Sequence, residues 1–231
     1  MTIYTLTYNE ELMLPFFIEH YRSRFPDCRI VVYDNESTDR TQQIALEAGC
    51  ELRINDTGGK LDDMRYLEIK NNCWKETEGW VIVCDCDELL DIDKYSVGNM
   101  RLMGNTFFVS AGYNMVNMHN DLNLAGLDHG VRALSYDKLY CFDTRYISET
   151  NYEAGCHQAR PMGVLRTDNV PVRCYHYKYI NPDYMVARHK HFAERLSEVN
   201  KQRGFGGHYQ YTEAQIRAEF EQARSMAVKI R

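Results

Sequence analysis

Short apolar runs alternate with helical patterns over the first 90 residues of the chain. Between the runs, apolar side chains recur every three or four residues, as at Met13, Phe17 and Tyr21, which is the spacing of one helix face. This alternation predicts a parallel sheet with crossover helices. The predicted strands are residues 2–8, 29–33, 50–54 and 80–84.

The pattern changes after residue 100. Two strand-like stretches, residues 106–116 and 132–142, are separated by polar loops. A helical pattern begins at Pro182, continues to about Val199 and is broken by a glycine-rich run at 204–207. A last helix is predicted after Thr212, with Gln215 placed for a capping box. The chain is therefore expected to be an α/β protein with a mixed sheet over residues 1–180 and a helical portion over 181–231.

Composition narrows the function classes. The chain has 231 residues, 44% of them hydrophobic, with 27 Lys and Arg against 33 Asp and Glu. The net charge of -6 argues against a surface that binds nucleic acid. No apolar stretch approaches the roughly 20 residues of a membrane-spanning helix, and no signal peptide is evident, so a cytoplasmic protein is expected. The eight cysteines lack zinc-site spacing and are interpreted as reduced core residues.

An acidic cluster follows the most apolar predicted strand. Asp85 and Asp87 come directly after residues 80–84, at the carboxyl end of the sheet where α/β proteins bind ligands. Two carboxylates so close can converge on one hard cation, Mg²⁺ or Mn²⁺, which is commonly shared with substrate phosphates. The alternative is a loop of solvated acids that caps the following turn.

Three motifs in order resemble family 2 glycosyltransferases of the GT-A type. They are the stretch 4–11, Asp34-Asn35-x-Ser37-x-Asp39, and Asp85-x-Asp87-Glu88. The resemblance covers residues 2–90 and extends more loosely to about 209. It implies a GT-A fold with a nucleotide-binding half over 1–100 and an acceptor half over 101–180. It also implies inverting transfer of a sugar from a nucleoside-diphosphate sugar to a glycan or other hydroxyl acceptor, as in glycan biosynthesis, with a divalent cation.

The same resemblance implies roles for individual residues. Metal ligands would be Asp85, Asp87 and His176. The nucleotide or its diphosphate would be contacted by Thr5, Thr7, Asn9, Glu10, Asp34, Lys60, Asp62, Arg65, Asp85, Cys86 and Lys178. Arg195 and His208 would belong to a C-terminal segment that closes over the donor. Several of these residues have a plainer alternative: Asp34 could form a turn, the charges at 60–65 could be exposed, and His176 could simply be packed.

Inverting transfer requires a general base that takes the acceptor proton. Glu153 is preferred because it shares a glycine-bearing loop with His157, which would orient the acceptor or assist the base. Asp128 is a further candidate, as are Asp143 and Glu149. All of these acids have an alternative interpretation as surface residues.

Two other function classes remain open. One is a carbohydrate-binding or nucleotide-binding module without turnover, which a single sequence does not exclude. The other is a phosphohydrolase of the haloacid dehalogenase kind, whose Asp-x-Asp follows the first strand. Here the motif comes after three strand–helix units and continues Glu88-Leu89-Leu90, which disfavours that class.

Overall fold

The computed structural model describes residues 1–119 and 121–231, which form two five-stranded sheets. In the first sheet the strand order is β3-β2-β1-β4-β8. Four of these strands are parallel and β8 is antiparallel. Their bounds are β1 (Thr2–Thr7), β2 (Arg29–Asp34), β3 (Glu51–Ile54), β4 (Trp80–Asp85) and β8 (Cys141–Asp143). The predicted α/β class with a mixed sheet is confirmed.

Crossover helices cover both faces of this sheet. They are α1 (Met13–Arg24), α2 (Thr41–Glu47) and α3 (Asp63–Asn72). Successive strand residues point to opposite faces, so Ile3 packs in the cluster that contains α1, whereas Tyr4 packs in the cluster that contains Trp74 after α3. Both residues are fully buried or nearly so, which explains the unbroken apolar runs.

The second sheet places the late histidine beside the acidic cluster. Its order is β12-β7-β6-β11-β5. Its strands are β5 (Glu88–Leu90), β6 (Ser110–Val116), β7 (His129–Arg132), β11 (Val172–Tyr179) and β12 (Val228–Lys229). On β11, His176 is in register with Glu88 of antiparallel β5 and with Asn114 of parallel β6. Strand pairing therefore brings together residues that lie far apart in sequence.

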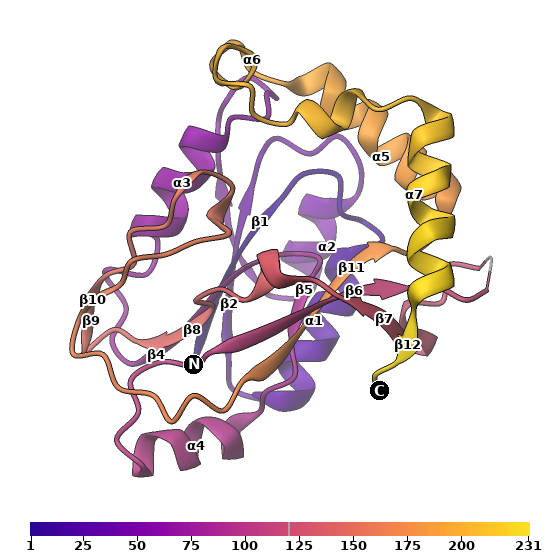
Figure 1. Ribbon diagram of the computed structural model, residues 1–231. Coiled ribbons are helices and arrows are strands. Elements are labelled where there is room, and N and C mark those ends of the chain that lie inside the picture. Colours follow the sequence, from indigo (N-terminus) through magenta and orange to yellow (C-terminus); the bar gives the residue numbers. More distant parts are fainter. Residues whose placement is uncertain (120) are drawn as a thin grey trace.

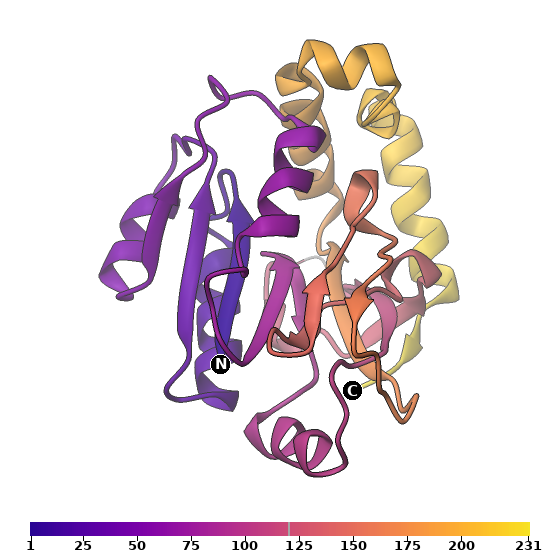
Figure 2. The same ribbon diagram turned by 90° about the vertical axis from the view of Figure 1, so that its left-hand side faces the viewer.

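The C-terminal helices lie over the carboxyl ends of the parallel strands, and α4 (Lys94–Leu102) lies at the opposite end of the molecule (Figures 1 and 2). They are α5 (Pro182–Arg195), α6 (Glu198–Arg203) and α7 (Glu213–Met226). Phe220 and Met185 pack against Val116 of the second sheet. The predicted capping box at Thr212 and Gln215 is present. Strand β12 then returns to pair with β7, so the segment after 181 is not purely helical.

Three predicted elements were wrong in extent. The stretch 132–142 is not one strand, because a 3₁₀ turn, η2 (Leu134–Tyr136), separates β7 from β8 and sends them into different sheets. The strand predicted at 106–116 begins at Ser110. The helix predicted as continuous to Val199 ends at Arg195, because the backbone there pairs with Leu61 ahead of α3. The pairing uses hydrogen bonds that a continued helix would need for itself.

The remaining short elements are β9 (Ile147–Glu149), β10 (Met162–Gly163), η1 (Leu124–Gly126), η3 (Ala154–Cys156) and η4 (Gly207–Gln210). All eight cysteines are free thiols, and six are buried. Among the described residues, no helix is long and apolar enough to cross a membrane.

Candidate active site

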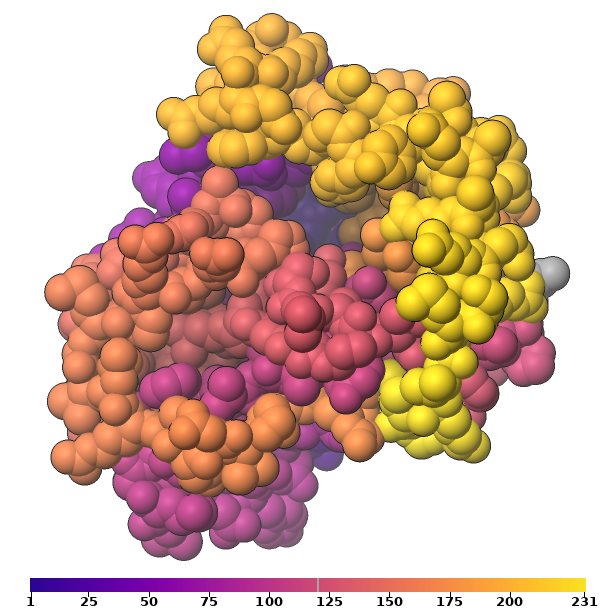
Figure 3. Space-filling model, viewed as in Figure 1, coloured from indigo at the N-terminus to yellow at the C-terminus, as the bar shows by residue number. Residues whose placement is uncertain are grey.

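A cavity of about 290 Å³ lies where the two sheets and the C-terminal helices meet. Figure 3 shows the recess between the last helices and the segment near residues 150–160. Its volume is at the low end of ligand sites, which span about 300–1,000 Å³. Its charged and histidine lining consists of Glu10, Asp63, Lys70, Asp85, Asp87, Glu88, His157, His176, Lys178, Arg188, His189 and His208. Half of the eight histidines of the chain therefore line one cavity.

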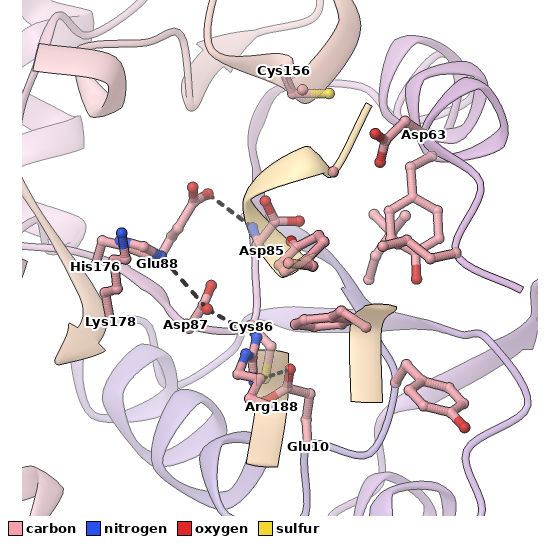
Figure 4. Close-up of a pocket in the computed structure, with 18 of the residues that line it drawn as sticks. Glu10, Asp63, Asp85, Cys86, Asp87, Glu88, Cys156, His176, Lys178 and Arg188 are labelled. Carbon is pink, nitrogen blue, oxygen red and sulfur yellow. Dashed lines mark hydrogen bonds and ion pairs between the residues drawn. The ribbon is translucent and has the colours of Figure 1, made fainter. Parts of the chain in front are cut away.

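Asp87 is held by two groups of opposite charge or polarity. Arg188 of α5 donates to its Oδ2 at 3.0 Å, and His176 Nε2 lies 3.6 Å from the same oxygen (Figure 4). Burial alone would raise the pKa of Asp87, but His176 and Arg188 outweigh burial and hold that pKa well below its usual range. Arg188 also pairs with Glu10 at 2.7 Å. Burial nevertheless raises the pKa of Glu10 to about 7.

Asp85 is held by a buried lysine. Lys70 of α3 contacts Asp85 Oδ1 at 2.6 Å, and its side chain is only 5% exposed. The Asp85 backbone N–H donates to Glu88 Oε2 at 3.0 Å, and Lys138 contacts Glu88 Oε1 at 2.6 Å. Burial favours the neutral acid at Asp85, but the Lys70 and Lys138 ammonium groups outweigh it and lower the pKa of that carboxyl. The turn after β4 is thus a chain of alternating charges.

His176 is oriented as a ligand would be. Its Nδ1 lies 2.7 Å from Asn114 Oδ1, so Nδ1 donates to Asn114 and Nε2 is directed toward Asp87. Tyr136 stacks on the imidazole with ring centroids 4.0 Å apart. Metal-binding histidines are commonly fixed through the second ring nitrogen in this way.

The donor set fits a divalent cation in part. Asp87 and His176 face each other across a space that one ion could share, and both are oxygen or nitrogen ligands suited to Mn²⁺. Asp85 lines the same cavity, but Lys70 occupies one of its oxygens. Within the part of the chain that the structure describes, no three His, Cys, Asp or Glu side chains converge as a preformed metal cluster. The remaining ligands would have to come from substrate or water.

The residues predicted to hold the nucleotide fall into two groups. Thr7 and Glu10 line the cavity. Asp34 is fully buried and its oxygens accept from Thr7, Ser37 and Gln42, so a base contact would require exchanging one of these bonds. Thr5 is also fully buried and does not line the cavity.

The Asn9 side chain is hydrogen-bonded to the 37–39 turn, where its amide oxygen accepts from Thr38 N–H at 2.8 Å. Asp62 caps α3 through the N–H groups of Met64 and Arg65. Lys60 is exposed, and Arg65 pairs with Glu68. These four predicted residues have local structural partners or face solvent, and none of them lines the cavity.

The predicted C-terminal contacts lie closer to the cavity. Arg195 packs over the Tyr8 ring, 2.9 Å from its centroid, and donates to Asn35 Oδ1 and Gly59 O, each at 2.7 Å. It ties α5 to the loops after β2 and β3. Lys178 and His208 line the cavity, although Lys178 also pairs with Glu219 at 2.6 Å. Cys86 lines it too but is 2% exposed.

The predicted general bases are mostly outside the cavity. Glu153 pairs with exposed Arg160, and Asp128 pairs with His129 and Lys229 near the chain end, and neither acid lines the cavity. His157 does line it. Its Nδ1 lies 3.1 Å from Ser135 O, and burial together with Lys138 lowers its pKa, so Nε2 is available as a proton acceptor.

Asp143 and Glu149, the remaining candidate bases, are each paired. Asp143 is 1% exposed and pairs with Arg145, and Glu149 pairs with Lys75 at 2.8 Å. Neither lines the cavity.

Sequence reasoning missed Lys70, Lys138, Arg188 and Asp63. Lys70 sits where the apolar stripe of the 64–74 helix should continue, four residues before Trp74, and a charge in such a stripe is a usable signal of a buried partner. Asp63 lines the cavity, and burial raises its pKa. It is the lining acid without a cation within salt-bridge distance among the described residues.

Comparison with known families agrees with the motif order. Residues 2–97 match the sequence model of the family described as glycosyl transferase family 2. The match contains β1 to β5 and hence the whole Asp85–Asp87 turn, and the resemblance seen in the sequence is confirmed for these residues. No curated protein sequence matches the chain.

Solved structures with a similar arrangement are distant. S. aureus TarS 1-349 in complex with UDP is 14% identical, with a TM-score of 0.45 over 95% of this chain and 70% of that one. The mannosyltransferase PcManGT from Pyrobaculum calidifontis, in complex with GDP-Man and Mn²⁺, is 13% identical, with a TM-score of 0.42 over 84% and 62%. This chain spans 42% of the chain in another TarS structure.

Proposed function

We propose that the chain is a glycosyltransferase whose cavity binds a nucleoside-diphosphate sugar at the Asp85–Asp87 turn. One observation carries the proposal: Asp85 and Asp87, within the residues that match the family 2 model, line a single cavity with His176 at the carboxyl end of β4. This is the edge at which open α/β sheets bind ligands. A haloacid dehalogenase-like hydrolase is disfavoured by the same family match.

The charge of the cavity suits a diphosphate only with help from cations. The lining has five acids against three cations, so acidic side chains are in excess; the acids are Glu10, Asp63, Asp85, Asp87 and Glu88, and the cations are Lys70, Lys178 and Arg188. A diphosphate adds more. A divalent cation would restore the balance, and that argues for metal dependence.

Asp87 and His176 would hold the cation, with Asp85 as a third ligand. When bound, the ion would neutralise the charge that develops on the departing nucleoside diphosphate. Asn114 keeps Nε2 of His176 directed at Asp87, and Arg188 holds the Asp87 carboxylate in the ionised form. Both arrangements exist before any ligand binds, which reduces the reorganisation needed during transfer.

The acceptor is proposed to be a carbohydrate hydroxyl, deprotonated as it attacks the anomeric carbon with inversion. Asp63 and His157 are the cavity-lining groups suited to take that proton, because neither forms an ion pair in the described chain. Glu153 remains the sequence-based proposal and would need its loop to move inward. Asp63→Asn, His157→Gln and Glu153→Gln separate the three, since loss of the base lowers acceptor-dependent transfer while donor binding persists.

Donor binding and turnover test the proposal together. We expect UDP or GDP with Mn²⁺ to raise the melting temperature, since ligands that bind the folded state stabilise it. Asp87→Asn should lower turnover of the matching sugar nucleotide by roughly 100-fold or more. Asp183→Asn is the matched control, because exposed Asp183 pairs with Arg217 outside the cavity, and it should retain native activity.

Three results would each contradict a different part of the proposal. Full activity of Asp87→Asn contradicts the site assignment. Nucleotide binding without any donor hydrolysis or transfer favours the binding-module alternative. Proton NMR of the product that shows retained anomeric configuration contradicts single displacement.

A further inference from the structure

Lys70 sits in the wall of the cavity with its ammonium committed to Asp85. The Nζ to Oδ1 distance is 2.6 Å, and the lysine side chain is 5% exposed whereas the Asp85 side chain is 36% exposed (Figure 4 shows Asp85). An ammonium this deeply buried is stable only beside a negative partner. Any cation that approaches Asp85 from the cavity must therefore share the carboxylate with a fixed positive charge.

Among the described residues, Lys70 forms a salt bridge with Asp85 alone. The nearest alternative in this chain of charges is Glu88, but Lys138 contacts Glu88 Oε1 at 2.6 Å and the Asp85 N–H donates to Oε2 at 3.0 Å. Both Glu88 oxygens are used. Asp63 lines the same cavity but lies beyond salt-bridge distance of Lys70, so Lys70 is left on Asp85.

Asp87 differs from Asp85 because its cation has a second carboxylate partner. Its cation, Arg188, already bridges to Glu10 at 2.7 Å while it contacts Asp87 at 3.0 Å. Arg188 keeps a partner if Asp87 turns to an incoming ion. His176 Nε2 faces the same Asp87 oxygen at 3.6 Å. The two acids of the Asp-x-Asp turn are thus unequally available.

We propose that Lys70 withholds Asp85 from the divalent cation until a nucleoside diphosphate is present, so that the empty protein binds the cation through Asp87 and His176 only. This inference rests on the proposed function. The diphosphate supplies the anionic oxygens that offset the Lys70 ammonium and complete the coordination of the ion. The cation and the nucleotide then strengthen each other's binding, and Lys70 is a positioning residue that couples them.

Mn²⁺ binding to the nucleotide-free protein tests this, with free Mn²⁺ followed by electron paramagnetic resonance. Lys70→Met should bind Mn²⁺ at least about tenfold more tightly than the native protein, because a charge repelling the dication is removed and Asp85 is released. Lys75→Met is the matched control, since Lys75 pairs with Glu149 outside the cavity. It should leave the Mn²⁺ affinity unchanged. Equal or weaker Mn²⁺ binding by Lys70→Met overturns the proposal.

A charge-matched double variant tests whether Asp85 is the group released, and its comparison with the native protein holds even if Lys70→Met folds poorly. Lys70→Met with Asp85→Asn removes both partners, so it should bind Mn²⁺ within about twofold of the native protein in the absence of nucleotide. Affinity well below native would show that Asp85 already binds the ion, and affinity equal to Lys70→Met would show that Asp85 is not the group released. Either result overturns the proposal.

Failure of this inference is distinguishable from failure of the proposed function. Native protein that binds Mn²⁺ with UDP or GDP, while Lys70→Met behaves as native without nucleotide, overturns the coupling alone. If no variant binds Mn²⁺ with or without either nucleotide, both the coupling and the metal-dependent function are wrong.

Discussion

Removing the Lys138 ammonium should destabilise the protein more than any surface charge change. Lys138 and Glu88 are 3% and 2% exposed and their charged atoms are 2.6 Å apart. Lys138→Met leaves the Glu88 carboxylate buried beside Asp85 without its counter-charge. Breaking a buried pair by removing one partner costs about 3–5 kcal/mol. For a chain of this size, where each kcal/mol shifts the melting temperature by roughly 2–4 °C, we expect a decrease of about 10 °C.

Urea unfolding followed by circular dichroism measures this loss, and an unchanged m-value would show that the native fold is retained. The neutral pair Lys138→Met with Glu88→Gln should recover most of the stability, because no charge is left unpaired. Lys75→Met removes a lysine from the exposed pair with Glu149 and should cost less than about 1 kcal/mol. A loss below about 1 kcal/mol for Lys138→Met would refute the reasoning.

Three further outcomes are expected. Burial lowers the pKa of His20 to about 4, below the unfolded value near 6.5, so the unfolded state takes up the proton first. The free energy of unfolding should therefore fall by roughly 3 kcal/mol as the pH drops from about 6.5 to 4. Urea titrations of His20→Gln should show a flatter profile over this pH range. The lowered pKa of Asp87 gives stability that is present above about pH 4 and lost as the pH falls below it, and unfolding midpoints of Asp87→Asn at pH 5 to 3 should lack that loss. Gly112→Ala would place a Cβ 2.2 Å from Tyr136 Cβ, so it should cost about 1–3 kcal/mol in thermal unfolding and weaken Mn²⁺ binding by disturbing the ring that stacks on His176.

The local pattern of apolar residues was sufficient to predict an element where burial alone decides its sequence. The parallel strands around Trp80–Asp85 are buried on both faces, so their apolar runs mark them directly. The carboxyl end of β4 then places Asp85 and Asp87 at the edge of the sheet where α/β proteins bind ligands. In residues 132–142 the pattern misled, because Tyr136 is strand-like by composition yet turns inward to stack on His176 in space left by Gly112.

The partners of the acidic residues were decided only by tertiary structure. Sequence alone determined the alternation of strands and helices up to β4, the acidic turn and the late histidine, because these depend on the period of buried residues and on where strands end. It did not determine that Asp85 meets Lys70 or that Asp87 meets Arg188, 101 residues away along the chain. Which charges neutralise one another depends on distances across the folded chain, and a buried ion pair leaves no periodic trace in the sequence.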